Sequence, residues 1–168
     1  MKTERKQKVQ VVALIIAILI PLIVGGVSAI LTAGDMDIYE TMNQPALAPP
    51  SWLFPIAWTI LYILMGLASY FIFTSNAPAR AKWTALAFYF AQLVLNFFWT
   101  PIFFTYSLYL IALIVLLVMW AFVLVCVILF FRIKPVAGVL MCVLLLWTTF
   151  AAYLNLSYYL MSITPMPL

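Results

Sequence analysis

Aromatic and polar side chains recur at helical spacing in three apolar segments of the chain. The three sets are Trp58, Tyr62, Met65 and Ser69; Gln92, Asn96 and Trp99; and Trp147, Ala151, Leu154, Asn155 and Tyr158. Residues three or four positions apart lie on the same side of an α-helix. We therefore predict that each set forms one face of a helix, with its polar groups beside its aromatic rings.

The amides of these sets are expected to face the interior of a helical bundle, because an unpaired amide is costly in hydrocarbon. Hydrogen bonding between helices would explain such a residue, and we favour that interpretation for Asn155. For Asn96, one helical turn before Trp99, we favour a pocket in which the amide meets polar groups of a ligand and the indole stacks on it. A mostly apolar cavity with few polar groups suits a flat hydrophobic ligand.

Several kinds of chemistry are excluded by the residues that the chain lacks. It contains no histidine, which removes Ser-His and Cys-His nucleophile pairs and His-bound metals. The apolar segments contain no Asp, Glu, Lys or Arg, and such residues mark proton and ion pathways inside membranes. Cys126 and Cys142 fall on different segments and are interpreted as small buried apolar residues, with a metal pair or a disulfide as the alternative. We expect no catalytic residue and no metal site.

The composition indicates the elements that position these side chains. The chain has 168 residues, of which 68% are hydrophobic and 7% charged, whereas a soluble domain is roughly half apolar and about a quarter charged. Soluble, disordered and nucleic-acid-binding proteins are therefore excluded. A bilayer core needs about 20 apolar residues per helix, and the segments long enough are 9–31, 55–74, 83–104, 108–131 and 136–161. We predict one all-α integral membrane domain over residues 1–168, a five-transmembrane-helix bundle.

Charges at the ends of these segments predict the topology. The eight basic residues precede the first segment or lie between the second and third or the fourth and fifth; they are Lys2, Arg5, Lys6, Lys8, Arg80, Lys82, Arg132 and Lys134. Asp35, Asp37 and Glu40 follow the first segment. The positive-inside rule then gives a cytoplasmic N-terminus and an external C-terminus. Cleavage of a signal peptide near residues 27–29 is the alternative, which the length of the first segment disfavours.

Two further features concern the ends of the bundle. The loop 35–54 contains Pro45, Pro49 and Pro50, which stiffen it, so we predict a lid over the external mouth, with a plain linker as the alternative. Aromatic residues near the segment ends are expected at headgroup level; these are Trp52, Trp83, Tyr106 and Tyr109.

Three motifs occur in order along the chain. They are PPSWLFPIAWTILYILMG at 49–66, NFFW at 96–99 and WTTFAAYLN at 147–155. Together they resemble the TspO/MBR family of tryptophan-rich sensory and translocator proteins. The resemblance implies a homodimeric five-helix bundle that binds porphyrins such as protoporphyrin IX, with a role in tetrapyrrole or stress sensing or transport. It also implies synthetic benzodiazepine-type ligands and, in mitochondrial relatives, cholesterol.

The resemblance also assigns residues. The positions that match the family's ligand pocket are Trp58, Tyr62, Asn96, Trp99, Trp147, Ala151 and Leu154. A small-xxx-small pair, Ala87 and Ala91, matches the dimer contact of bacterial relatives. The resemblance implies that the porphyrin is a ligand, and we expect that no cofactor is required.

The chain departs from the family at three places. Leu47 and Ile38 stand where loop tryptophans are common, and Val143-Leu144 replaces a Pro-Tyr pair. The loss of two loop tryptophans counts against the tryptophan-dependent porphyrin breakdown attributed to some members. Two alternatives to a binding protein stay open. One is a photo-oxidative porphyrin-degrading enzyme that relies on Trp58 and Trp147, and the other is a partner-regulating membrane protein whose pocket holds lipid.

Overall fold

The computed structural model describes residues 2–35, 44–45 and 47–164, of which 2–8 and 35 by their backbone alone. The elements are α1 (Lys2–Leu31), the short 3₁₀ helix η1 (Ala33–Asp35), α3 (Leu53–Phe73), α4 (Ala79–Phe104), α5 (Tyr109–Ile133) and α6 (Pro135–Ile163). Five of these helices are long and apolar enough to cross a bilayer, α1 through Val9–Leu31. No strand occurs in the described part of the chain. The predicted all-α class and five spans are confirmed.

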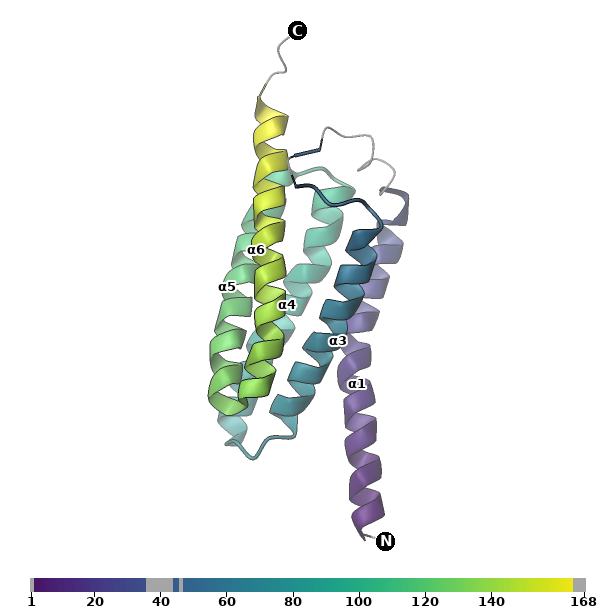
Figure 1. The fold of residues 1–168 in the computed structure, drawn as a ribbon, viewed down its shortest axis with the longest axis vertical. Coiled ribbons are helices and arrows are strands. Elements are labelled where there is room, and N and C mark those ends of the chain that lie inside the picture. The colour runs from purple at the N-terminus through teal and green to yellow at the C-terminus, as the bar shows by residue number, and fades with distance from the viewer. Residues whose placement is uncertain (1, 36–43, 46, 165–168) are drawn as a thin grey trace.

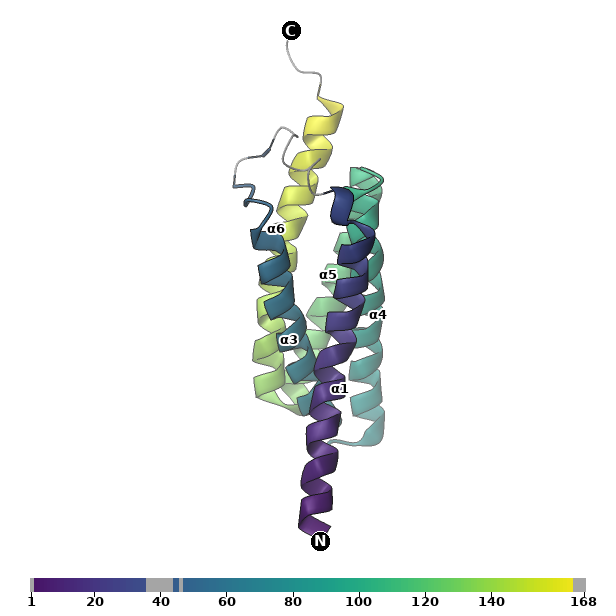
Figure 2. The same ribbon diagram turned by 90° about the vertical axis from the view of Figure 1, so that its right-hand side faces the viewer.

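The five long helices form a ring (Figure 1). Going around it, α1 packs on α3, α3 on α6, α6 on α5, α5 on α4, and α4 again on α1. In the orthogonal view, α1 lies between α3 and α4 (Figure 2). The N-terminal part of α1 extends beyond the ends of the other helices (Figure 1). The long connection between α1 and α3 therefore lies at the end of the bundle opposite the N-terminus.

Short connections hold α4, α5 and α6 together. Four residues join α4 to α5, with Ser107 at a φ of 51°. Pro101 lies inside α4, and its carbonyl accepts the backbone N–H groups of Thr105 and Tyr106. Lys134 alone separates α5 from α6, and Pro135 takes the first helical position, where its missing N–H costs nothing.

The helices extend beyond several predicted segments. α3 begins at Leu53 rather than at residue 55, and α4 begins at Ala79 rather than at residue 83. The reason is that hydropathy marks the part of a helix that lies in hydrocarbon, whereas the hydrogen bonds of a helix continue into the interface. Pro55 lies in the first turn of α3, which tolerates proline.

α1 meets the bundle along a narrow stripe. Its buried residues from Val9 onward are Pro21, Gly25 and Ser28, and Thr32 follows just after the helix; they lie three or four positions apart and so on one face. Large apolar residues such as Ile16, Ile23 and Ile30 are exposed on its other faces, where lipid is the solvent for them.

Close approach of α1 and α3 depends on two glycines. A Cβ on Gly66 of α3 would lie 2.5 Å from Cα of Ile18 and 2.7 Å from the carbonyl oxygen of Ala17. Those are backbone atoms of α1, so they cannot move aside as a side chain can. On α1, Gly25 packs against the ring of Tyr62, which would collide with a Cβ at that position.

Substitution of Gly66 by alanine is expected to destabilise the protein by about 1–3 kcal/mol, because the added methyl must push α1 away from α3. The measurement is the thermal unfolding midpoint of the detergent-solubilised protein. Gly26→Ala is the matched control, since a Cβ there meets no atom within 4 Å. Equal midpoints for the two variants would show that α1 is not held by this backbone contact.

Candidate ligand-binding site

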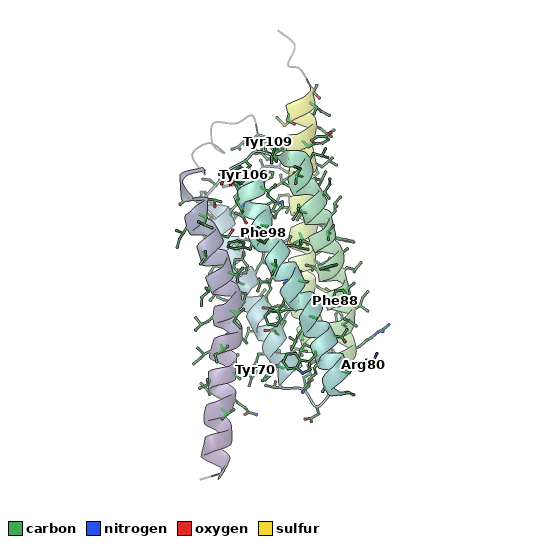
Figure 3. All side chains as sticks on the ribbon, turned by 180° about the vertical axis from the view of Figure 1, so that it is seen from behind. Tyr70, Arg80, Phe88, Phe98, Tyr106 and Tyr109 are labelled. Atoms are coloured by element: carbon green, nitrogen blue, oxygen red, sulfur yellow. The ribbon has the colours of Figure 1, made fainter. Side chains whose placement is uncertain are left out.

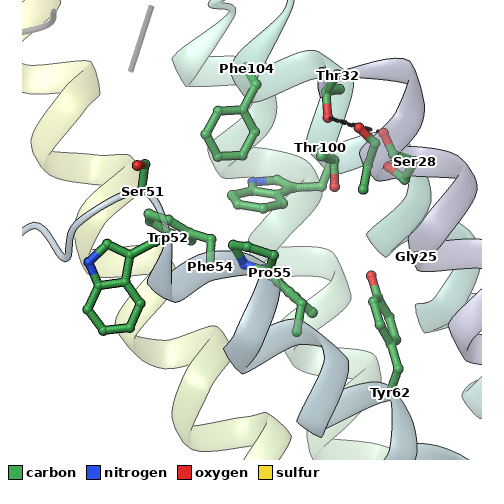
Figure 4. A pocket seen from close by; sticks show the side chains of 13 residues that line it. Gly25, Ser28, Thr32, Ser51, Trp52, Phe54, Pro55, Tyr62, Thr100 and Phe104 are labelled. Carbon is green, nitrogen blue, oxygen red and sulfur yellow. Dashed lines mark hydrogen bonds between the residues drawn. The ribbon is translucent and has the colours of Figure 1, made fainter. Parts of the chain in front are cut away.

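A cavity of about 340 Å³ lies between α1, α3 and α4, near the connection from α1 to α3 (Figure 4). Its volume is within the range of about 300–1,000 Å³ that is usual for small-molecule sites. The residues that line it are Gly25, Ser28, Ala29, Thr32, Ser51, Trp52, Phe54, Pro55, Trp58, Tyr62, Trp99, Thr100 and Phe104. No charged residue is among them.

Aromatic rings form the wall on the side of α3 and α4. Trp58 and Tyr62 are stacked, with ring centroids 5.5 Å apart and planes 29° apart. The ring centroids of Trp58 and Trp99 are 6.3 Å apart, and those of Trp99 and Phe104, which pack edge to face, are 6.1 Å apart. Flat aromatic surfaces favour offset-stacked or edge-to-face contact with another ring. The wall is therefore suited to a planar apolar ligand.

Hydroxyl groups from α1 and α4 supply the polar part of the lining. Ser28 Oγ donates to the carbonyl of Phe97 at 3.1 Å, and Thr32 Oγ1 donates to the carbonyl of Ser28 at 3.1 Å. Thr100 Oγ1 donates to the carbonyl of Asn96 at 3.4 Å. Since each hydroxyl hydrogen already has an acceptor, these oxygens can offer their lone pairs to a ligand N–H or O–H.

Asn96 supports the cavity from behind. The Tyr62 hydroxyl donates to Asn96 Oδ1 at 2.7 Å, and both side chains are buried. Asn96 Nδ2 has no hydrogen-bond partner among the residues that the structure describes, and neither has the side-chain amide of the fully buried Gln92. The amide of Asn96 thus fixes the tilt of the Tyr62 ring rather than facing the cavity itself.

The third predicted set, on α6, lies behind the cavity wall. Trp147 packs edge to face against Trp58 and Phe54, each at 6.4 Å. Ala151 and Leu154 line a separate void of about 10 Å³ on the other side of Trp99. These contacts support the rings of α3 and α4 from the interior of the bundle.

Asn155 joins three helices. Its Oδ1 accepts the indole N–H of Trp99 at 3.1 Å, and its Nδ2 donates to the backbone carbonyl of Tyr109 at 2.8 Å. The structure therefore agrees with the prediction that Asn155 makes hydrogen bonds between helices.

Of the seven predicted ligand-pocket residues, the structure brings Trp58, Tyr62 and Trp99 to the main cavity. Asn96 and Trp147 touch those rings from outside the lining, and Ala151 and Leu154 border the small void. The seven are thus contiguous in space, but they form one wall and its support rather than a complete enclosure.

The sequence interpretation missed the opposite wall. Ser28 of α1, Thr32 just after it and Ser51 of the loop line the cavity, although they belong to none of the aromatic stripes. A signal was present, because the small residues Gly25, Ser28 and Thr32 recur at helical spacing in a segment otherwise rich in Ile, Val and Leu.

Two of the four residues expected at headgroup level also make contacts with the cavity or with the interior of the bundle. Trp52, though 61% exposed, lines the cavity mouth. Tyr109, the first residue of α5, is half-buried and also stacks on Tyr158 with ring centroids 5.9 Å apart; its position at headgroup level stays a prediction. Trp83 and Tyr106 are exposed near helix ends, as expected.

The loop after α1 is described from its C-terminal part. Ile38 and Tyr39 lie outside the described residues. Leu47 has a φ of 70° and an exposed side chain, so it does not contribute to the cavity wall. Ser51 and Trp52 border the mouth, and closure of a lid there stays a prediction.

The two cysteines form no disulfide with each other. Cys126 and Cys142 are free, the first buried and the second half-buried. No group of three or more metal-ligating side chains occurs among the described residues. The interpretation of both cysteines as small apolar residues stands.

Replacement of Tyr62 by phenylalanine is expected to destabilise the protein by about 1–3 kcal/mol, because Asn96 Oδ1 is left buried without its donor. The thermal unfolding midpoint measures this, with Tyr106→Phe as the control at an exposed position. The double variant Tyr62→Phe/Asn96→Leu should recover part of the loss. A midpoint for Tyr62→Phe equal to that of the control would contradict the assigned hydrogen bond.

Comparison with known proteins is consistent with this architecture. The family model described as TspO/MBR family matches residues 17–160. The chain is 48% identical over 66 residues to the tryptophan-rich sensory protein of Cereibacter sphaeroides, covering 39% of each chain. It is 31% identical over 117 residues to the tryptophan-rich protein TspO of Chlorobaculum tepidum, covering 70% of this chain and 74% of that one.

A human relative is also similar. The translocator protein of Homo sapiens is 36% identical over 67 residues, covering 39% of this chain and 40% of that protein. The chain thus spans about two-fifths of the length of this relative and of the Cereibacter one. Since the family model covers all five membrane-spanning helices from Ala17 onward, this integral, multi-pass membrane protein belongs to the TspO/MBR family of sensory and translocator proteins.

Proposed function

We propose that this protein binds porphyrins such as protoporphyrin IX, and other flat hydrophobic molecules, in the cavity between α1, α3 and α4. In this function it acts as a receptor or transport protein in tetrapyrrole or stress sensing. The observation that carries the proposal is the uncharged cavity walled by Trp58, Trp99 and Phe104. Porphyrins are planar and apolar over most of their area, so stacking and burial both favour them there.

The carboxylates at the polar edge of a porphyrin would lie at the cavity mouth. Carboxylates are costly in a low-dielectric interior without a cation, and the described lining contains none. The mouth lies beside Ser51 and Trp52 at the end of the bundle (Figure 4). A porphyrin with its rings between α1 and α4 would keep its carboxylates at that mouth, in contact with water.

We also propose the orientation and the oligomeric state. The described basic residues Arg80, Lys82, Arg132 and Lys134 lie at the same end as the N-terminus, so the positive-inside rule places that end in the cytoplasm. The cavity mouth then faces the external side. A homodimer would use the outer face of α4, where Ala87 is exposed and Ala91 half-buried, and small residues allow close helix approach.

Trp58→Leu is expected to weaken protoporphyrin IX binding about tenfold, because a stacking surface is lost while the other walls remain. The measurement is titration of the purified protein followed by the porphyrin absorbance band, which does not depend on the number of tryptophans. Trp83→Leu is the control, since Trp83 is exposed at the far end of α4. Equal affinities for the two variants would rule out this cavity as the porphyrin site.

The enzyme alternative has a structural basis in the edge-to-face contact of Trp58 with Trp147 at 6.4 Å. For a binding protein we expect illuminated protoporphyrin IX to lose its absorbance no faster in the protein than in empty detergent micelles. Loss that is faster in the protein and slowed by Trp147→Phe would favour tryptophan-dependent breakdown. Absence of any porphyrin binding, with lipid co-purifying instead, would favour the lipid-filled alternative.

A further inference from the structure

A second cavity lies at the opposite end of the bundle from the aromatic one. It has a volume of about 570 Å³ and lies between the connection from α3 to α4 and the junction of α5 with α6. Its polar lining is Thr74, Ser75, Asn76, Arg132 and Lys134, beside the ring of Tyr70. It shares no lining residue with the aromatic cavity.

Two cations on this cavity have no anionic partner in the fold. Neither Arg132 nor Lys134 forms an ion pair with any residue that the structure describes, and both are exposed. The sequence explains why: from residue 44 to residue 168 the chain contains no Asp or Glu. Of the four acidic residues, Glu4 lies near the start of α1 with its side chain outside the described part of the structure, and Asp35, Asp37 and Glu40 follow α1 in the sequence. No residue whose side chain the structure describes therefore supplies an anion to this site.

The neighbouring Lys82 has a different, structural role. Its Nζ donates to the backbone carbonyls of Phe73 at 3.3 Å and Ser75 at 3.1 Å. These are carbonyls at the C-terminal end of α3, where a cation is favoured. Lys82 thus holds the Ser75 side of the cavity in position, while Arg132 and Lys134 on the other side keep their N–H groups available.

The donors at this cavity match phosphate. A guanidinium presents planar, paired N–H groups that fit phosphate oxygens, and an ammonium adds a point charge. The hydroxyls of Thr74 and Ser75 already donate to the carbonyls of Tyr70 and Ile72, each at 2.8 Å, so the cations are the main donors. Arg132 is in the last turn of α5.

The level of the cavity in the membrane indicates the source of the phosphate. Arg132 and Lys134 end a helix whose exposed residues are Ile, Leu, Val and Phe, and that surface is in contact with lipid chains. In Figure 3, Tyr70 and Arg80 lie at this end of the molecule and Tyr106 and Tyr109 at the other. Basic pockets at the cytoplasmic ends of membrane helices are the usual sites for anionic headgroups.

We propose that this cavity binds the headgroup phosphate of an anionic phospholipid, with Arg132 and Lys134 as its ligands and the lipid chains lying along the outer surface of α5. The site is separate from the porphyrin cavity, so it stands or falls independently of the proposed function.

Native mass spectrometry of the detergent-solubilised protein tests the proposal, with phosphatidylglycerol and phosphatidylcholine of identical chains as probes. Phosphatidylglycerol should bind about tenfold more tightly than phosphatidylcholine, and Arg132→Gln should remove most of that preference. Arg80→Gln is the matched control: it removes the same charge at the same end of the bundle, and Arg80 is exposed but outside the cavity lining. Arg132→Gln/Lys134→Gln should abolish the preference altogether.

Three outcomes would overturn the proposal. No preference for phosphatidylglycerol would exclude an anion site, and equal weakening by Arg132→Gln and Arg80→Gln would indicate diffuse attraction to the basic end. Displacement of the lipid by inorganic phosphate or glycerol phosphate at equal concentration would show that the free anion, not the lipid, is the ligand. Unchanged size-exclusion profiles and unfolding midpoints of the variants separate these results from loss of fold.

Discussion

The hydrogen bond from the Trp99 indole to Asn155, 3.1 Å long, connects the interior of the bundle to the cavity wall. The same amide donates to the Tyr109 carbonyl at 2.8 Å, so one side chain joins α4, α5 and α6. In hydrocarbon no water replaces a lost partner, and the indole is therefore held in one orientation. Its face borders the cavity. The rigid wall on which a planar ligand would stack thus depends on a polar pair that is buried behind it.

The cavity wall formed by α1 consists of small residues rather than aromatic rings. α4, α5 and α6 follow one another through connections of a few residues, whereas a long connection separates α1 from α3. α1 touches the bundle through small residues, and it approaches most closely where Gly66 meets its backbone. Near Gly25, Ser28 and Thr32 the side chains are too short to fill the space against Trp58 and Trp99, and this is where the cavity lies. The ligand space is therefore a consequence of small residues on one helix facing large aromatic residues on two others.

The two ends of the bundle differ in chemistry. At the end with the connection from α1 to α3, an uncharged cavity opens beside serine and tryptophan. At the other end, arginine and lysine border a cavity whose described lining contains no acidic residue. This asymmetry follows from the confinement of charge to the helix ends in a chain with 12 charged side chains, counted as 8 Lys and Arg plus 4 Asp and Glu. The sites proposed for a flat apolar ligand and for an anionic headgroup therefore share no lining residue.

The sequence by itself determined the class of protein, its five spans and its family, because apolar length and helical spacing are local properties that no tertiary contact alters. It also identified the aromatic stripes, and Trp58, Tyr62 and Trp99 do border the cavity. Only the tertiary structure decided which helix faces them: α6 supports the wall from behind, through Trp147 and Asn155, and α1 closes the cavity from the front. Spacing along a helix places residues on one side of it, but the direction of that side depends on how five helices fill the space around one another.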